Sequence, residues 1–319
     1  MKISAFILAA GKGTRMLPFT SDTPKPMLPI LNKPIIFHSI KRLMKAQISD
    51  IGIIIGKNDH VIPLFINKHF PDLNPCFIEQ EEALGTAHAV LQVQDHLNTT
   101  NFLVIAGDSL FSPSFLKQLG ETHLKEENDI TLALEKMDFD LMRESSTVGY
   151  KNGRVFEVRE KPQTPAEILS DLNSAALYIF SDSIFDIIKG IKKSIRGEYE
   201  LVEAINKTIQ LGGQVGGLLT ERVCHISTIR DLWRFNLKFL SEKFKGEVNG
   251  NLIGDNVTIM ESAIVKNSIL GDSSYIKKGV VLNHCVVLPN TTIDRSYENS
   301  LIKSNFIVSF NDDIQFPPI

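Results

Sequence analysis

Short apolar runs alternate with amphipathic stretches over the first two thirds of the chain. Largely apolar runs of four to nine residues predict buried strands, here Ala5–Ala10, Ile51–Ile55, Cys76–Glu79, Asn101–Ala106, Ile130–Leu134, Leu172–Phe180 and Val215–Leu219. Apolar positions spaced three or four apart predict helices, here Pro34–Ala46, Thr86–Leu97, Pro113–Lys125, Glu200–Gln210 and Thr228–Phe244. Because strands that alternate with helices pair mostly in parallel, the pattern predicts a mixed, mainly parallel sheet with helices on both faces.

The hydrophobic pattern changes near residue 245. Aliphatic residues then recur at every sixth position, with one single-residue slip, at Ile253, Ile259, Val265, Leu270, Ile276, Leu282 and Leu288. This hexapeptide repeat predicts a left-handed parallel β-helix of about two to three coils, with the aliphatic side chains inside a triangular core. The sequence therefore predicts two domains, a Rossmann-like α/β domain over 1–245 and a β-helix over 246–319. The tail from Phe306 is expected to cover part of the stack.

Composition narrows the function classes. The 319 residues are 43% hydrophobic and 22% charged with a net charge of −3, as in a globular protein without a basic field for nucleic acid. No apolar run approaches the roughly 18 residues of a membrane span, and no signal peptide precedes the first strand, so the cytoplasm is expected. Three widely spaced cysteines, Cys76, Cys224 and Cys285, are expected to be reduced, packed thiols.

A glycine-rich stretch after the first strand suits phosphate. Gly11-Lys12-Gly13-Thr14-Arg15 provides backbone N–H groups and a cation, and Pro24-Lys25-Pro26 adds a second cation. A P-loop would need Ser or Thr directly after Lys12, and a dinucleotide fingerprint would need a small residue in place of Met16. An ordinary strand-to-helix turn is the alternative, but the added Arg15 and Lys25 favour a nucleotide site.

Two more strands end in polar residues at the same expected edge of the sheet. Gln80 offers an amide donor and acceptor for the imide edge of uracil or thymine, and Gly85 would let the backbone approach the base. The alternative for this stretch is a turn that caps the next helix through Thr86. Asp108 follows Gly107 and is placed to hold Mg²⁺, which prefers oxygen ligands; its alternative is a helix cap, although Ser112 suits that role better.

The stretch from Leu8 to Arg15, followed by Pro24-Lys25-Pro26, resembles the signature of the sugar-1-phosphate nucleotidylyltransferases, which include uridylyl- and thymidylyltransferases. The resemblance implies transfer of a nucleoside monophosphate from a nucleoside triphosphate, UTP or dTTP, to a sugar 1-phosphate. It implies Mg²⁺ or another divalent cation at Asp108, and catalysis by Arg15, Lys25 and Asp108. The nucleotide-binding residues would be Leu8, Ala9, Ala10, Gly11, Gly13, Thr14, Arg15, Gln80, Gly85 and Thr86.

The same resemblance implies an acceptor site for the sugar phosphate. Glu160 and Asn173 would bind sugar hydroxyls, Lys161 would face the phosphate, and Gly149 would line the site. A solvated charge pair and a strand-edge amide are the alternatives. The chain departs from the family at His225, where a second metal ligand, Asp or Asn, is usual. His225 leaves three interpretations: a metal held by Asp108, phosphates and water, a softer divalent ion, or weak catalysis.

Two rival functions remain open at this point. A catalytically weak subunit that binds nucleotide and sugar phosphate would have the same fold, and His225 motivates it. A hexapeptide acyltransferase would need more coils, so His284 is interpreted as a surface residue rather than an acyl-transfer base. The short repeat stack would expose an end and is expected to assemble homo-oligomers.

Overall fold

The computed structural model describes residues 3–220, 223–244, 250–304 and 306–311. The described chain divides into two compact units. The first unit comprises residues 1–11 and 37–224, and the second comprises residues 12–36 and 225–319. The division of the chain into domains at residue 245 stays a prediction, because it follows the hydrophobic pattern, whereas the units follow spatial contacts. Each unit is described separately below.

The first unit contains these strands: β1 Ser4–Leu8, β4 Ile51–Gly56, β5 Cys76–Gln80, β6 Asn101–Ala106, β7 Ser109–Leu110, β8 Ile130–Lys136, β9 Ser146–Lys151, β10 Arg154–Glu160, β11 Leu172–Ser181 and β12 Val215–Leu219. Its helices are most of α1 Ile35–Lys45, then α2 Val61–His69, α3 Thr86–Leu91, α4 Pro113–Lys125, α5 Phe139–Met142, α6 Ile184–Gly190 and α7 Leu201–Gln210. β13, Cys224–His225, lies at the boundary of the two units.

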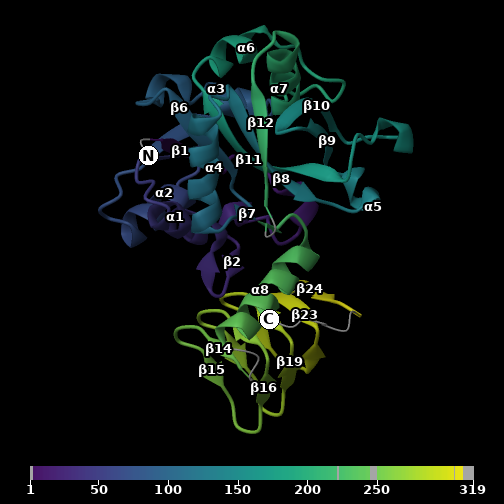
Figure 1. Cartoon of the computed structure of the whole chain (residues 1–319). Helices are drawn as coiled ribbons and strands as arrows, with labels where there is room; N and C mark the ends of the chain where they lie inside the picture. The colour runs from purple at the N-terminus through teal and green to yellow at the C-terminus, as the bar shows by residue number, and fades with distance from the viewer. Residues whose placement is uncertain (1–2, 221–222, 245–249, 305, 312–319) are drawn as a thin grey trace. The chain divides into compact units, whose positions relative to one another are not determined.

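Nine strands form one sheet in the order β5-β4-β1-β6-β11-β8-β12-β10-β9. β1 pairs in parallel with β4 and β6, β4 with β5, and β12 with β8. β11 is antiparallel to both β6 and β8, and β10 is antiparallel to β9 and β12. The predicted mixed α/β sheet is confirmed (Figure 1). The four strands β5-β4-β1-β6 form its expected parallel part.

Helices cover both faces of this sheet. α3, α6 and α7 pack against one another over a core in which Phe6, Phe102, Leu132 and Ile205 are buried. α4 lies on the opposite face, since its His123 ring contacts Thr131, whose side chain points away from that of Leu132. A strand buried on both faces is apolar at most positions, which explains the largely apolar runs in the sequence.

Two differences from the predicted elements have physical causes. The helix expected over 86–97 ends at Leu91, and the chain continues in the 3₁₀ turn Gln94–His96, where the His96 N–H bonds the Val93 carbonyl three residues back. α2 was not predicted; Pro63 falls in its first turn, where a missing N–H costs nothing.

The second unit holds the hexapeptide repeat. Its α8, Ile229–Lys243, begins with a capping box between Thr228 and Asp231 and packs against β17, β20 and β23. The repeat strands form three parallel ladders, consistent with a left-handed β-helix. They are β14 Leu252–Ile253, β15 Thr258–Ile259, β16 Ile264–Lys266, β17 Ile269–Leu270, β18 Tyr275–Ile276, β19 Val281–Asn283, β20 Val286–Val287, β21 Thr292–Ile293, β22 Tyr297–Glu298 and β23 Ser300–Lys303.

The aliphatic side chains of the repeat differ in solvent exposure between coils. Leu270, Ile276 and Leu282 are fully buried, whereas Ile253 and Ile259 are 44% and 43% exposed. Ile253 pairs in register with Leu270, so it points the same way but belongs to the first coil, which among the described residues has a neighbouring coil on one side only. The expected open end of the stack is therefore present at the first coil.

The chain tail folds back on the stack, as expected. β24, Phe306–Ser309, pairs antiparallel with β23, and the Phe310 ring stacks on Trp233 of α8 at 4.5 Å between centroids. Residues 312–319 lie outside the described part of the chain. Cys76, Cys224 and Cys285 are free thiols, as predicted. Among the described residues, no helix has both the length and the apolar character needed to cross a membrane.

Candidate nucleotide and sugar-phosphate site

Three of the predicted segments of the first unit meet at one edge of the sheet. Ala9–Gly11 follow β1, Gln80 ends β5, and Asp108 follows β6 by two residues. The backbone fixes these ends, because the Ala9 N–H bonds the Ile54 carbonyl at 2.7 Å and the Gly107 N–H bonds the Leu8 carbonyl at 2.9 Å. Parallel pairing thus places the expected phosphate, base and metal segments beside one another.

Gln80 is oriented by a residue that the sequence did not single out. Its side-chain nitrogen lies 3.1 Å from His88 Nδ1 on α3 and 3.4 Å from the Gly85 carbonyl. The residue is only 6% exposed, so its amide has little rotational freedom. An amide held through its nitrogen presents its oxygen in a fixed direction, which suits recognition of one edge of a base. The signal available in the sequence was the spacing of His88 after Gly85-Thr86.

Gly85 is required by packing between two loops. Its φ is 119°, and a Cβ at this position would lie 2.4 Å from the Tyr199 carbonyl oxygen. The Tyr199 N–H bonds the Leu84 carbonyl at 2.8 Å, and the Ala87 N–H bonds the Tyr199 carbonyl at 2.9 Å. The space at Gly85 is thus filled by protein backbone, which gives a reason for the glycine other than approach to a base. Thr86 Oγ1 accepts the Leu201 N–H at 3.1 Å and so caps α7 rather than its own helix.

Asp108 offers the kind of oxygen ligand that Mg²⁺ prefers. It is half-buried, and Ser109 Oγ donates to its Oδ1 at 3.1 Å. Within the described ranges, no group of three or more His, Cys, Asp or Glu side chains could hold a metal ion. A cation held by Asp108, phosphates and water, a set that Mg²⁺ accepts readily, stays a prediction.

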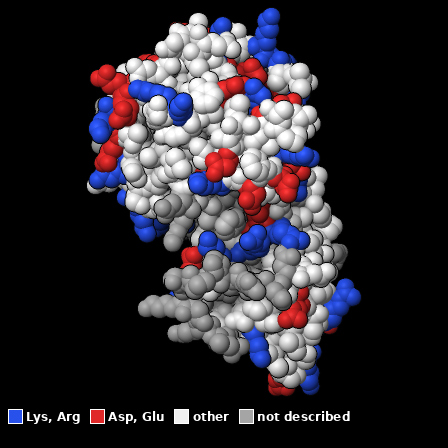
Figure 2. All heavy atoms as spheres, turned by 45° about the vertical axis from the view of Figure 1, so that its right-hand side comes forward, with Lys and Arg blue, Asp and Glu red and all other residues white. Residues whose placement is uncertain are grey.

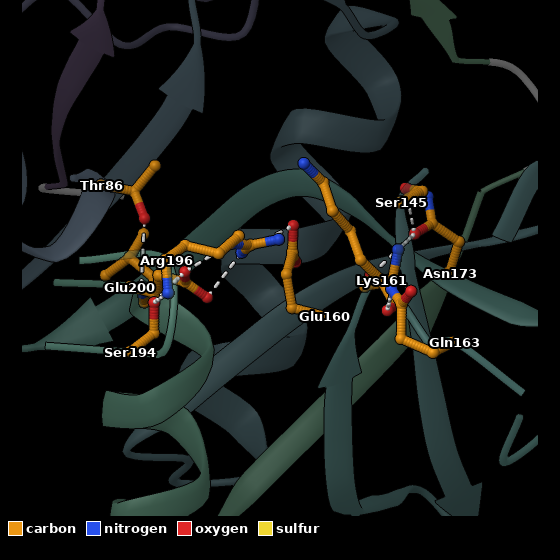
Figure 3. A network of polar contacts seen from close by, with 11 residues as sticks. Thr86, Ser145, Glu160, Lys161, Gln163, Asn173, Ser194, Arg196 and Glu200 are labelled. Carbon is orange, nitrogen blue, oxygen red and sulfur yellow. Dashed lines mark hydrogen bonds and ion pairs between the residues drawn. The ribbon is translucent and has the colours of Figure 1, made fainter. Parts of the chain in front are cut away.

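Glu160 belongs to an ion-pair network that Figure 3 shows from close by. Arg196 lies between two carboxylates, with its Nη2 2.7 Å from Glu200 Oε2 and 3.6 Å from Glu160 Oε1. Its Nε also donates to Glu200 Oε1 at 2.8 Å, and Ser194 Oγ donates to the same oxygen at 2.6 Å. The guanidinium therefore binds Glu200 through two nitrogens, one to each carboxylate oxygen, whereas its contact with Glu160 is longer and weaker.

Electrostatics set Glu160 apart from a surface carboxylate. Burial raises the pKa of Glu160, the Arg196 guanidinium opposes this rise, and the Glu200 carboxylate adds to it. The Glu160 side chain is 30% exposed, so it is accessible to a ligand while being partly removed from water. Arg196 and Glu200 were missed at the sequence level; the charged run Arg196-Gly-Glu-Tyr-Glu200 before α7 was the available signal.

Asn173 is buried, at 2% exposure, and most of its amide is used inside the protein. Its Oδ1 accepts hydrogen bonds from Ser145 Oγ, Ser146 N and Ser146 Oγ, and its Nδ2 donates to Glu135 at 2.9 Å. Asn173 thus fixes the start of β9 against β11, whether or not it also contacts a sugar.

Gly149 lies in β9, and Lys161 directly follows the neighbouring strand β10. The Lys161 N–H bonds the Ser145 carbonyl at 2.6 Å, its φ is 48°, and its side chain is exposed (Figure 3). A left-handed conformation at a residue other than glycine costs of order 1 kcal/mol and is often found at functional sites. Gly149 packs under the Phe156 ring, 2.4 Å from where its Cβ would be.

The loop with the two cations belongs to the second unit. Gly13 has a φ of 62°, and its missing Cβ would lie 3.1 Å from Lys25 Cβ. Thr14–Met16 and Lys25–Met27 form 3₁₀ turns, in which Arg15 is exposed and Lys25 is half-buried. The structure thus brings Gly13 and Lys25 together within this unit. His225 also belongs to this unit and is half-buried.

Acidic and basic side chains are interspersed on the face drawn in Figure 2. With a net charge of −3 over the whole chain, attraction of a triphosphate depends on particular side chains such as Arg15 and Lys25.

Comparison with known proteins gives a consistent result. The model of the family called Nucleotidyl transferase matches residues 4–242. The bifunctional protein GlmU of Methanococcus maripaludis (strain C7 / ATCC BAA-1331) is 34% identical over 269 residues, covering 83% of this chain and 62% of GlmU. The UTP--glucose-1-phosphate uridylyltransferase AglF of Haloferax volcanii is 29% identical over 246 residues, covering 77% of this chain and 95% of AglF.

A solved structure supports the fold. The structure of a UDP-glucose pyrophosphorylase complexed with UDP-glucose superposes with a TM-score of 0.68 and 21% identity, covering 77% of this chain and all of that one. The present chain spans only 62% of the length of the GlmU relative. Since the family model matches most of the sheet unit, the signature loop and α8, the chain belongs to the Nucleotidyl transferase family.

Proposed function

We propose that the protein transfers a nucleoside monophosphate from UTP or dTTP to a sugar 1-phosphate and releases pyrophosphate. The observation that carries this proposal is the meeting of Ala9–Gly11, Gln80 and Asp108 at one sheet edge, in a member of the Nucleotidyl transferase family. The relative AglF is named as a uridylyltransferase that uses glucose 1-phosphate, which supports the substrate class. The reaction would take place in the cytoplasm, where nucleoside triphosphates are available.

Each residue then has a part in an in-line displacement. A phosphate oxygen of the acceptor forms a bond to the α-phosphorus, the bond from that phosphorus to the bridging oxygen breaks, and pyrophosphate leaves with the electron pair. Arg15 would neutralise the leaving pyrophosphate and Lys25 the charge around the α-phosphate, while the backbone from Gly11 to Thr14 holds the triphosphate. No covalent enzyme intermediate is needed, so catalysis consists of positioning and charge neutralisation.

The acceptor would be bound by the Glu160 segment. The Glu160 carboxylate accepts hydrogen bonds from sugar hydroxyls, and the exposed Lys161 ammonium faces the sugar phosphate. Asn173 keeps one amide hydrogen beyond its bond to Glu135, which it would direct at a sugar hydroxyl. Asp108 would hold a divalent cation, which would supply positive charge against the phosphate oxygens.

The test is pyrophosphate release with a panel of four nucleoside triphosphates, several sugar 1-phosphates, and Mg²⁺ or Mn²⁺. Turnover that requires UTP or dTTP together with a sugar 1-phosphate supports the proposal. Lys25→Ala is expected to abolish turnover while the circular dichroism spectrum stays unchanged, and Lys33→Ala, an exposed lysine of the same loop, serves as the control. Full activity of Lys25→Ala would refute the role of this lysine.

The second candidate is a subunit that binds these ligands without turnover. His225, in the place where an Asp or Asn is expected, is the feature that favours it. Nucleotide binding by calorimetry with no pyrophosphate release under any combination would establish this alternative. Acetyl transfer from acetyl-CoA would point instead to an acyltransferase, which the small number of coils among the described residues disfavours.

A further inference from the structure

A lysine of the β-helix binds the loop that carries the two predicted catalytic cations. Lys303 on β23 is 14% exposed, and its ammonium donates to the Phe19 carbonyl at 2.9 Å and lies 3.4 Å from Thr23 Oγ1. It also forms an ion pair with the Asp22 carboxylate. An ammonium has three donor hydrogens, and all three acceptors lie within the five residues from Phe19 to Thr23.

This segment connects Arg15 with Lys25 along the chain, and the contacts continue on both sides. Phe19 is fully buried, so the segment has an apolar anchor as well. Thr20 Oγ1 donates to the Gly13 carbonyl at 2.9 Å, and Gly13 packs against Lys25. A shift of Phe19–Thr23 would therefore move the glycine turn and the half-buried Lys25 together.

The far end of the loop is tied to the same unit. Asn32, in the turn between β2 Pro29–Ile30 and β3 Lys33–Pro34, donates to the Leu270 carbonyl of β17 at 2.8 Å. Asn236 of α8, 1% exposed, accepts the Leu31 N–H at 2.8 Å and donates to the Pro29 carbonyl at 2.9 Å. The β-helix and the helix packed on it thus hold the loop at two separate places.

From this geometry we propose that the β-helix is the scaffold that positions the triphosphate loop, with Lys303 as the positioning residue. The inference rests on the proposed function, in which Arg15 and Lys25 of this loop hold the triphosphate. A loop fixed before the ligand arrives avoids the entropy cost of ordering it during binding, so the benefit is expected in nucleotide affinity and in turnover. The Lys303 ammonium also lowers the pKa of Asp22.

The test compares Lys303→Met with the unchanged protein in the pyrophosphate-release assay. Methionine keeps the aliphatic stem and removes the three donors. We expect the KM for the nucleoside triphosphate to rise about tenfold and kcat to fall, while the KM for the sugar 1-phosphate stays within about twofold. Lys303→Arg, which retains the charge and several donors, is expected to recover part of the nucleotide affinity.

Lys277→Met is the matched control. Lys277 also lies in the β-helix, is 52% exposed and pairs with Asp294 at 3.8 Å, so it tests the loss of a β-helix ion pair that does not involve the loop. We expect both KM values to stay unchanged in this variant. An equal rise of both KM values in Lys303→Met would indicate general destabilisation and would overturn the positioning role.

A second variant keeps the test decisive if Lys303→Met fails to fold. Asp22→Asn changes the loop side of the contact only, and it is expected to raise the triphosphate KM about threefold. An unchanged triphosphate KM in Asp22→Asn and in any folded Lys303 variant would refute the inference while leaving the proposed function intact. Absence of turnover in the unchanged protein would refute the proposed function itself, and the positioning role with it.

Discussion

Replacing Glu200 by glutamine removes one negative charge from the group that holds Arg196, without changing the length of the side chain. The Glu200 carboxylate is 9% exposed and binds the guanidinium through both of its oxygens. Glutamine has one acceptor oxygen, so at least one charge-assisted hydrogen bond is lost, which is worth roughly 1.5–3 kcal/mol when buried. Because the Arg196 side chain is 33% exposed, hydrogen bonds to water replace part of the lost free energy, and a net loss of about 1–2 kcal/mol remains.

This loss of interaction free energy is expected to weaken binding of the acceptor, the sugar 1-phosphate. Arg196 would stay beside Glu160 but would be held there less rigidly, and about 1.4 kcal/mol corresponds to a tenfold rise in the KM for the sugar 1-phosphate. The KM for the triphosphate should change little, because the bonds between Tyr199 and Leu84–Ala87 involve backbone only. Initial rates at saturating triphosphate measure the KM for the sugar 1-phosphate, and initial rates at saturating sugar 1-phosphate measure the KM for the triphosphate.

The pH dependence of Glu200→Gln gives a separate readout. In the proposed acceptor site, the ionised Glu160 carboxylate accepts from sugar hydroxyls more strongly than the neutral acid. Because the pKa of Glu160 is raised, we expect the acid limb of kcat/KM for the acceptor to lie above the range of an ordinary glutamate. The groups that act on the pKa of Glu160 are Arg196, Glu200 and Lys161. Since Glu200 raises this pKa, its neutralisation should move the acid limb to lower pH.

The control for Glu200→Gln is Glu203→Gln, the same chemical change at an exposed position in the first turn of α7. It should leave both KM values and the acid limb where they are. An acceptor KM within about twofold of the unchanged protein, or an acid limb that does not move in Glu200→Gln, would refute the reasoning. A rise in both KM values would mean that the whole loop around Tyr199 had shifted.

Three further predictions concern stability and the metal. Gly85→Ala should lower the free energy of unfolding in urea by about 2–4 kcal/mol, because the added Cβ meets the Tyr199 backbone. The control is Gly153→Ala, which also has a positive φ but open space around it, and it should lower the free energy of unfolding by about 1 kcal/mol. Burial lowers the pKa of His123 to about 4 from 6.5, so on acidification the unfolded chain binds a proton at this histidine before the folded protein does. The free energy of unfolding should therefore fall by up to about 3 kcal/mol between pH 6.5 and 4. A His123→Gln variant should lack this part of the fall, and identical curves of unfolding free energy against pH for the variant and the unchanged protein would contradict the prediction. Asp108→Asn should raise the Mg²⁺ concentration needed for half-maximal turnover at least tenfold with little change in the urea midpoint, and an unchanged Mg²⁺ requirement would argue against this ligand.

The sheet and the β-helix were predictable because each imposes a pattern on consecutive residues. A strand buried on both faces is apolar at most positions, and a triangular coil places an aliphatic residue at about every sixth position. α2 lacked such a signal, because its exposed Val61 and Leu64 leave no clear polar face. The candidate segments Ala9–Gly11, Gln80 and Asp108 were found because parallel strands bring their carboxyl ends together.

Partners that are distant in sequence could not be read from one chain. The atom that forbids a side chain at Gly85 belongs to Tyr199, and the oxygen that caps Leu201 belongs to Thr86, 115 residues away. From the sequence, approach to a base was the expected reason for Gly85, and this stays a prediction. The structure adds a second reason, the close packing of two backbones. Asn173 is a similar case: its buried bonds to Ser145, Ser146 and Glu135 depend on the pairing of strands.

The loop from Lys12 to Ile36 shows how a motif and a structural unit can differ. The signature starts on β1 of the sheet unit, yet its cations lie in the unit of the β-helix, where Lys303 and Asn236 hold the loop. A sequence motif records which residues a ligand needs, but it does not record what fixes them in place. In this protein that support comes from residues more than 200 positions further along the chain, so substitutions in the β-helix are expected to change nucleotide affinity without touching the nucleotide.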